Sequence, residues 1–298
     1  MYFAKELERT MKKIAVITDS NSGISQEEAA QLGVVVIPMP FTIDEVDYYE
    51  GINLSQKEFY KLLENGGEVT TSQPSPDSVM DAWDEALKTH DEIIHIPMSS
   101  GLSGSCQTAF MLAQDYEDKV FVVDNQRISV TLRQSVYDAI NLAKKGLNAS
   151  QIRDILVEDK FNSSIYIMLD TLKYLKKGGR ITPAAAALGE LLKIKPVLQI
   201  QGEKLDAFAK ARTVSSGKSI MFNAIREDAI KRFGGLTPDN VDIFVAYTDG
   251  CDVKEFVREI EAEFEGFKVE YADPLSLSIS CHIGPGSIAM ACNKKLKI

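Results

Sequence analysis

The chain has 298 residues, of which 45% are hydrophobic and 26% are charged, and its formal net charge at pH 7 is −10. This length and composition predict a globular protein with a sizeable core, arranged as one large domain or two ordinary ones. So acidic a chain is a poor general binder of nucleic acid. The four cysteines form no CxxC pair, and there is no signal peptide or long apolar run, so we expect free thiols and a cytoplasmic location.

The first half of the chain alternates short apolar runs with segments of helical spacing. Strands are predicted at 13–18, 34–38, 92–97 and 120–124, and helices at 24–32, 55–64, 76–87 and 104–113. Ser25 followed by Glu28 is a capping-box pattern that marks one helix start. This alternation predicts an α/β domain with a parallel sheet over residues 11–160. Residues 1–10 precede a second methionine and are interpreted as an N-terminal extension outside the fold.

The second half has a less regular pattern. Strands are predicted at 164–169, 196–200, 241–247 and 267–271, and helices at 171–176 and 184–192. Residues 283–291 could close the chain as a strand or as a helix. This mixture predicts a C-terminal α+β domain over residues 161–298.

Two polar runs stand out, Thr71–Ser75 (TSQPS) and Ser99–Ser105 (SSGLSGS). Each is expected to follow a buried strand, which places hydroxyl groups and backbone N–H groups where open α/β sheets bind ligands. Neutral donors of this kind suit an anion or a carboxylate held without a metal. A serine–glycine cluster between a strand and a helix can also be only a turn and an N-cap.

Motifs of other enzyme classes are incomplete. Ser103 lacks the spacing of a GxSxG nucleophile elbow, although a hydrolase or transferase using Ser103 with His282 stays open as an alternative. The run at 284–289 matches a dinucleotide fingerprint formally, but only 9 residues follow it, so a tight turn is the better interpretation. His95 lies within an apolar strand and is expected in the core. Asp19 and Asp124, at strand ends, could be caps or binding residues.

The segment from Thr171 to Lys195 is basic within an acidic chain. It has six cations and one anion, Glu190, and so a local charge of +5 (6 − 1). Both a solvated helix face and a docking surface are consistent with this pattern. The cations are Lys173, Lys176, Lys177, Arg180, Lys193 and Lys195.

Taken together, these segments resemble the DegV family from about Lys13 to the C-terminus. The set is specific although no single piece is. The matching pieces are Thr18-Asp19-Ser20, Thr71-Ser72-Gln73-Pro74, Ser99 to Gly104, Val123-Asp124, Gly178-Gly179-Arg180-Ile181, Leu191 to Pro196, and His282 to Gly286.

The resemblance implies a two-domain fold whose C-terminal domain completes a pocket around one long-chain fatty acid. It implies the fatty-acid-binding subunit of a bacterial fatty acid kinase, without catalysis, metal or cofactor of its own. A separate ATP-dependent kinase would phosphorylate the carboxylate, and the acyl phosphate would enter phospholipid synthesis. Transient contact with an anionic membrane or an acyltransferase is also expected, and no nucleic acid partner.

The resemblance also implies residue roles. Thr71 and Ser103 are expected to hold the carboxylate, with Arg180 and His282 nearby as cationic partners. One departure from the family pattern is Tyr247-Thr248-Asp249, where many members have a histidine. Supporting roles are expected for Ser72, Ser99, Ser100, Gly104 and Gly284.

Overall fold

The structure is a computed structural model that describes residues 12–187 and 194–297. The predicted extension at 1–10, residues 188–192 of the predicted helix at 184–192, and Lys193 of the basic segment lie outside the described residues. The strands are β1 (Ile14–Asp19), β2 (Val35–Ile37), β3 (Pro40–Ile43), β4 (Val46–Tyr49), β5 (Val69–Thr71), β6 (Glu92–Ile96), β7 (Val120–Val122), β8 (Ser163–Met168), β9 (Lys195–Ile200), β10 (Asp206–Ala211), β11 (Val241–Tyr247), β12 (Val269–Pro274) and β13 (Ile288–Lys294). The α-helices are α2 (Gln26–Leu32), α3 (Gln56–Glu64), α4 (Pro76–Leu87), α5 (Ser105–Ala113), α6 (Ser129–Lys144), α7 (Ala149–Glu158), α8 (Lys173–Gly178), α9 (Pro183–Ala187), α10 (Val214–Lys231), α11 (Val253–Glu263) and α12 (Leu277–Ile283).

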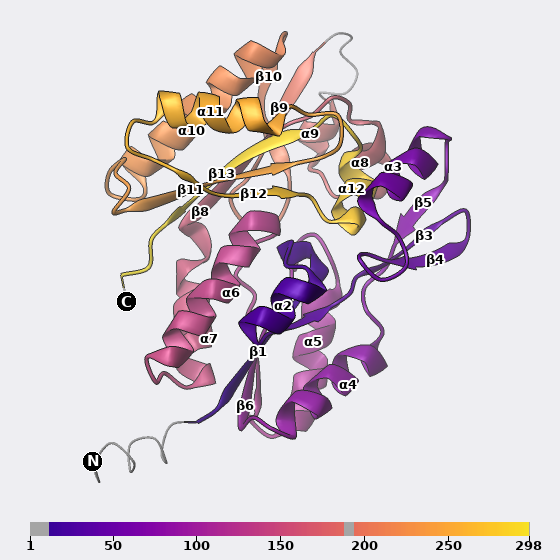
Figure 1. Ribbon diagram of the computed structural model, residues 1–298, viewed down its shortest axis with the longest axis vertical. Helices are drawn as coiled ribbons and strands as arrows, with labels where there is room; N and C mark the ends of the chain where they lie inside the picture. Colours follow the sequence, from indigo (N-terminus) through magenta and orange to yellow (C-terminus); the bar gives the residue numbers. More distant parts are fainter. Residues whose placement is uncertain (1–11, 188–193, 298) are drawn as a thin grey trace.

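The first sheet is parallel, with strand order β2-β1-β6-β7. Its strands are apolar on both faces because helices cover both. Trp83 of α4 and Cys106 of α5 pack on one face, in a cluster that includes Ile17 and Ile93. Helices α2 and α6 pack on the other face. The predicted parallel α/β unit is therefore confirmed (Figure 1).

The second sheet is larger and mixed, with strand order β10-β9-β8-β13-β11-β12. Only the β11–β12 pair is parallel among its neighbours. Helices α10 and α11 cover one face, and α6 touches strands of both this sheet and the first sheet. One hydrophobic cluster therefore runs from Ile94 of the first sheet to Phe244 of the second, and Figure 1 shows α6 between the two sheets.

A third, antiparallel sheet of order β4-β3-β5 was not predicted. Helix α3 connects β4 to β5 of this sheet. Phe41 of β3 and Phe59 of α3 pack in one cluster with Leu277 and Cys281 of α12. Contrary to the expectation, Thr71 ends a half-exposed edge strand of this sheet and not a buried strand of the parallel sheet. Short strands that expose one face have no clear apolar period, and so the sequence pattern missed them.

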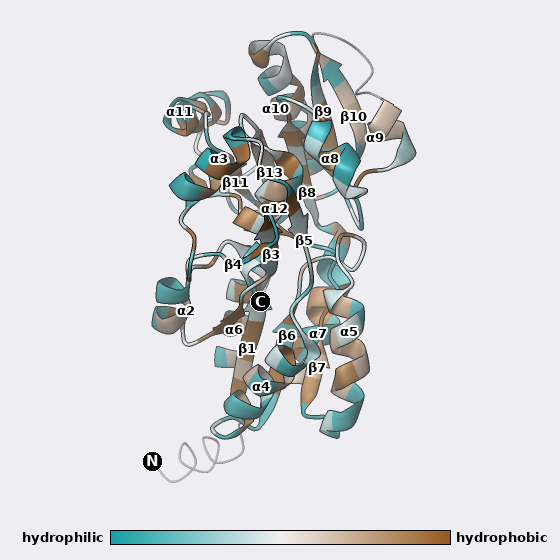
Figure 2. Cartoon of the chain, turned by 90° about the vertical axis from the view of Figure 1, so that its right-hand side faces the viewer, coloured by the Kyte–Doolittle hydropathy of each residue, from teal (hydrophilic) through white to brown (hydrophobic). Residues whose placement is uncertain are grey.

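The segment 283–291, left open as a strand or a helix, begins at the last residue of helix α12 and forms a turn and then the first part of strand β13. Gly284 ends α12 at φ +75°, and a Cβ there would lie 2.3 Å from the Tyr174 ring. The order helix–turn–strand is the reverse of a dinucleotide fingerprint, which agrees with the predicted tight turn. Figure 2 shows hydrophilic residues on the outer faces of most helices. In the part of the chain that the structure describes, no helix has the length and apolarity that crossing a bilayer requires.

Candidate functional site

A cavity, here called the ligand cavity, opens where the three sheets meet. It lies beside the switch point of the parallel sheet, since β2 and β6 flank β1 on opposite sides and the loops after β1 and β6 both reach it. Its volume is about 230 Å³.

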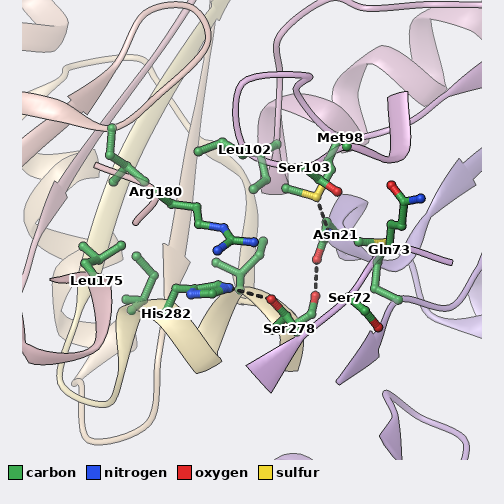
Figure 3. A pocket seen from close by; sticks show the side chains of 17 residues that line it. Asn21, Ser72, Gln73, Met98, Leu102, Ser103, Leu175, Arg180, Ser278 and His282 are labelled. Carbon is green, nitrogen blue, oxygen red and sulfur yellow. Dashed lines mark hydrogen bonds between the residues drawn. The ribbon is translucent and has the colours of Figure 1, made fainter. Parts of the chain in front are cut away.

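The polar end of the ligand cavity brings together the predicted site residues. Thr71, Ser103, Arg180 and His282 all line it, although 211 residues separate Thr71 from His282. Ser72, Gln73 and Gly104 line it too. Figure 3 shows these side chains around one hollow, with Arg180 and His282 opposite Ser103 and Gln73.

His282 and Thr71 form a direct pair. His282 comes from the last turn of α12, and its Nε2 lies 2.8 Å from Oγ1 of Thr71. Burial, with a smaller contribution from the Arg180 charge, lowers the pKa of His282 to about 4. The imidazole is thus neutral at pH 7, whereas a cation was expected. The backbone of Gly178 packs against the ring, because a Cβ there would lie 2.2 Å from Nδ1.

Arg180 provides a positive charge at this end of the cavity. It follows Gly179, whose left-handed φ of +67° ends α8 and turns the chain. Its guanidinium is half-buried and also donates to the Gly178 carbonyl. A guanidinium with free N–H groups matches a carboxylate in shape and charge. The lysines of α8 are different: Lys173, Lys176 and Lys177 are exposed and do not line the cavity.

The serine loop, residues 99–105, is held from both sides. The Ser99 hydroxyl donates to the Glu203 carbonyl at 3.0 Å, and the Ser100 N–H donates to the Asp124 carboxylate at 3.3 Å. Ser99, Ser100 and Gly284 were expected to support ligand binding, but they do not line the cavity. Ser99 and Ser100 instead hold the backbone of the serine loop through the two hydrogen bonds above. The loop ends at the N-terminus of α5, where Gly104 gives no side-chain cap. Free N–H groups at a helix N-terminus favour an anion.

The sequence analysis missed Asn21, which forms the back wall of the ligand cavity. Its amide donates to Sδ of Met98 at 2.7 Å and accepts from the Ser278 hydroxyl (Figure 3). It also accepts from the Ser276 hydroxyl. Asp19, left open above, is a cap that accepts from the Asn21 and Met98 N–H groups. A buried amide linking segments 255 residues apart has no local sequence signal.

The other end of the ligand cavity is apolar, and a second, smaller hollow of about 40 Å³, here called the tail hollow, lies beside it. The tail hollow reaches the second sheet, and Ser129 is its only polar lining residue within the described chain. The residues that line both spaces are Ile128, Leu205, Ile279 and Ile283.

Comparison with known proteins agrees with this architecture. A family model described as "Uncharacterised protein, DegV family" matches residues 13–295. The chain is 32% identical to a DegV domain-containing protein of Staphylococcus aureus, over 96% of this chain and 100% of the relative. A relative of the same description from Deinococcus radiodurans is 29% identical, over 93% and 97% of the two chains.

Two solved structures share the fold. A DegV family protein from Thermus thermophilus, described as binding fatty acid, is 29% identical with a TM-score of 0.85, over 95% of this chain and 100% of the other. DegV from Bacillus subtilis, described as a fatty acid binding protein, is 28% identical with a TM-score of 0.82 at the same coverage. With a family model matching nearly its whole length, the chain belongs to the DegV family.

Proposed function

We propose that this protein binds one long-chain fatty acid and presents its carboxylate to a separate ATP-dependent kinase, which forms the acyl phosphate. The observation that carries the binding proposal is the shape and polarity of the site. A polar end with hydroxyls and one guanidinium adjoins apolar space, and a second apolar hollow shares part of its wall. An amphiphile with one anionic head and a long apolar tail has the same division.

The apolar part supplies the larger share of the binding free energy. Moving one CH₂ group out of water is worth about 0.8 kcal/mol. An acyl tail that extends from Leu175 past Ile279 toward the tail hollow would lie against apolar side chains. Part of this gain offsets the loss of translational and rotational freedom on binding. The affinity is therefore expected to rise with chain length until the tail hollow is full.

The polar end satisfies the carboxylate, which cannot be buried without partners. Thr71 and Ser103 each offer a hydroxyl donor, and Arg180 offers charge. His282 is neutral and bonded to Thr71, so we assign it a role in orienting the Thr71 hydroxyl. Ser72 and Gly104, which line the cavity beside this set, are exposed, so a second protein could reach the carboxylate there.

The kinase step is inferred from family resemblance and from what the site lacks. The sequence has no GxxxxGK[ST] run for binding ATP phosphates. The exposed lysines of α8 lie next to Arg180 in the chain and offer a basic surface to an acidic partner. Entry of the acyl phosphate into phospholipid synthesis, and contact with a membrane or an acyltransferase, belong to the same proposal.

The test begins with the ligand itself. Mass spectrometry of an organic extract of purified protein should find a long-chain fatty acid, about one per chain. The stripped protein should bind added palmitate or oleate. It should consume no ATP alone and should support acyl phosphate formation with a cognate kinase. Absence of both extracted and added fatty acid would refute the binding proposal, and ATP turnover abolished by Ser103→Ala would favour an enzyme.

The alternative, a hydrolase or transferase using Ser103 with His282, is not favoured. His282 Nε2 bonds to Thr71, and Ser103 Oγ accepts from the Ser105 N–H at 3.2 Å. Within the described residues no hydrogen bond joins Ser103 to a histidine, and no carboxylate orients His282. A serine nucleophile needs both contacts.

A further inference from the structure

A small hollow lies beside the serine loop at Ser105, and it shares no lining residue with the ligand cavity. It is enclosed by the ends of β1 and β6 and by the first turns of α4 and α5, and its free space is about that of one water molecule. We call it the rear chamber. Its polar wall is formed by Asp19, His95, Ser105 and Thr108.

Two polar atoms of this wall have no hydrogen-bond partner among the described residues. They are Nδ1 of His95 and Oγ of Ser105, two buried atoms of residues that line the chamber, and His95 is only 3% exposed. Nearly all buried polar groups in proteins are hydrogen-bonded, and an unpaired one is costly. The Trp83 ring packs edge-on against His95 with centroids 5.5 Å apart, so apolar contact holds the imidazole in place without satisfying it.

The chemistry of the rear chamber selects a neutral ligand that can both donate and accept. Burial lowers the pKa of His95 to about 3, so the ring is neutral at pH 7. The Asp19 carboxylate already accepts from the N–H groups of Asn21 and Met98, and Thr108 is bonded to Gln73. An anion would be repelled by the Asp19 carboxylate. A cation would find too few free carboxylate oxygens to coordinate it, because those of Asp19 already accept hydrogen bonds. Water has the right size and hydrogen-bonding capacity.

We propose that the rear chamber binds one ordered water molecule bridging Nδ1 of His95 and Oγ of Ser105, and that His95 is thereby a positioning residue for the serine loop. The first turn of α5 transmits the effect. The Ser105 N–H donates to Oγ of Ser103 at 3.2 Å, and Thr108 exchanges hydrogen bonds of 3.0 and 3.2 Å with Gln73. Both polar runs of the ligand cavity therefore depend on where this turn sits.

The consequence for ligand binding rests on the proposed function, whereas the water site itself does not. A crystal structure at high resolution should show a peak about 2.6–3.2 Å from both atoms in the wild type. The peak should disappear in His95→Phe, which keeps a ring against Trp83 and removes the polar atom. Ser105→Ala should also lose the peak.

The functional arm uses palmitate titration of the stripped protein. His95→Phe and Ser105→Ala should each weaken palmitate binding roughly fivefold, the effect of losing one hydrogen bond. The double variant should bind no more weakly than either single variant, because both remove the same bridge. His95→Asn, which keeps a polar atom near the Nδ1 position, should recover most of the affinity. His90→Phe, at the far end of α4 and outside both cavities, is the control and should bind normally.

Three results would overturn the proposal: a wild-type map without the peak, losses that add in the double variant, or no rescue by His95→Asn. If His95→Phe does not fold, Ser105→Ala and the wild-type map carry the test. If the wild type binds no fatty acid, the proposed function fails, and the map still decides whether the rear chamber holds water.

Discussion

The substitution Thr71→Val tests the polar end of the ligand cavity with little change in shape. Thr71 is half-buried and its hydroxyl is bonded to His282 at 2.8 Å. If this hydroxyl donates to a bound carboxylate, its loss should cost about 1–3 kcal/mol of binding free energy, or about 5-fold to 150-fold in Kd. The lost bond to His282 affects the bound and free protein alike, so it should lower the unfolding free energy by about 1 kcal/mol without adding to the binding effect.

A neighbouring threonine provides a matched control. Thr70 lies in the same strand, is exposed, and pairs its hydroxyl with Thr42 at 2.6 Å instead of facing the cavity. Thr70→Val should keep wild-type affinity. Competition titration with a fluorescent fatty acid would measure Kd for both variants, and thermal unfolding would measure their stability. Equal affinity of Thr71→Val and Thr70→Val, with both folded, would show that the carboxylate lies elsewhere.

Three further outcomes are expected. The unfolding free energy of the wild type should fall relative to that of His282→Gln as the pH drops from 6.5 to 4. The reason is that the pKa of His282 is about 4 in the folded protein and about 6.5 in the unfolded chain, which therefore binds more protons in this range. Urea unfolding that gives the same pH dependence for both proteins would contradict this prediction. Ala289→Leu should narrow the tail hollow, so competition assays should show selective loss of longer acyl chains over shorter ones, and a uniform loss would indicate misfolding instead. Replacing Lys173, Lys176 and Lys177 by glutamate should slow kinase-coupled turnover and make it less salt-sensitive, while palmitate affinity stays unchanged. Equal losses in turnover and in palmitate binding would instead place these lysines in the pocket.

Local sequence determined the elements with strong apolar period and clear caps. The prediction of a helix start at Ser25 is confirmed, since Ser25 caps α2 by accepting from the Glu28 N–H. The buried strands β1 and β6 were predicted from short apolar runs, and the parallel sheet followed from their alternation with helices. These features depend on neighbours within a few residues, so a local pattern is enough to reveal them.

The chemistry of the site could be predicted only as residue types in short motifs. The motifs with Thr71, Ser103, Arg180 and His282 were identified, and the structure places all four around one cavity. Their roles as a carboxylate site remain a prediction. A local pattern gives no sign of the lowered pKa of His282, because that pKa is set by burial and by the charge of Arg180, 102 positions away (282 − 180).

Only the tertiary structure decided how the cavity is closed and where it leads. The edge strand β5 reaches α12 because the third sheet packs there, and no short-range pattern encodes that contact. Asn21 and the rear chamber of His95 likewise arise from segments far apart in the chain. The sequence by itself determined the buried strands of the parallel sheet, the helix start at Ser25 and the residue types of the motifs, because those are local. Packing between distant surfaces decided burial, protonation and the path into the tail hollow, because these depend on which elements meet in space.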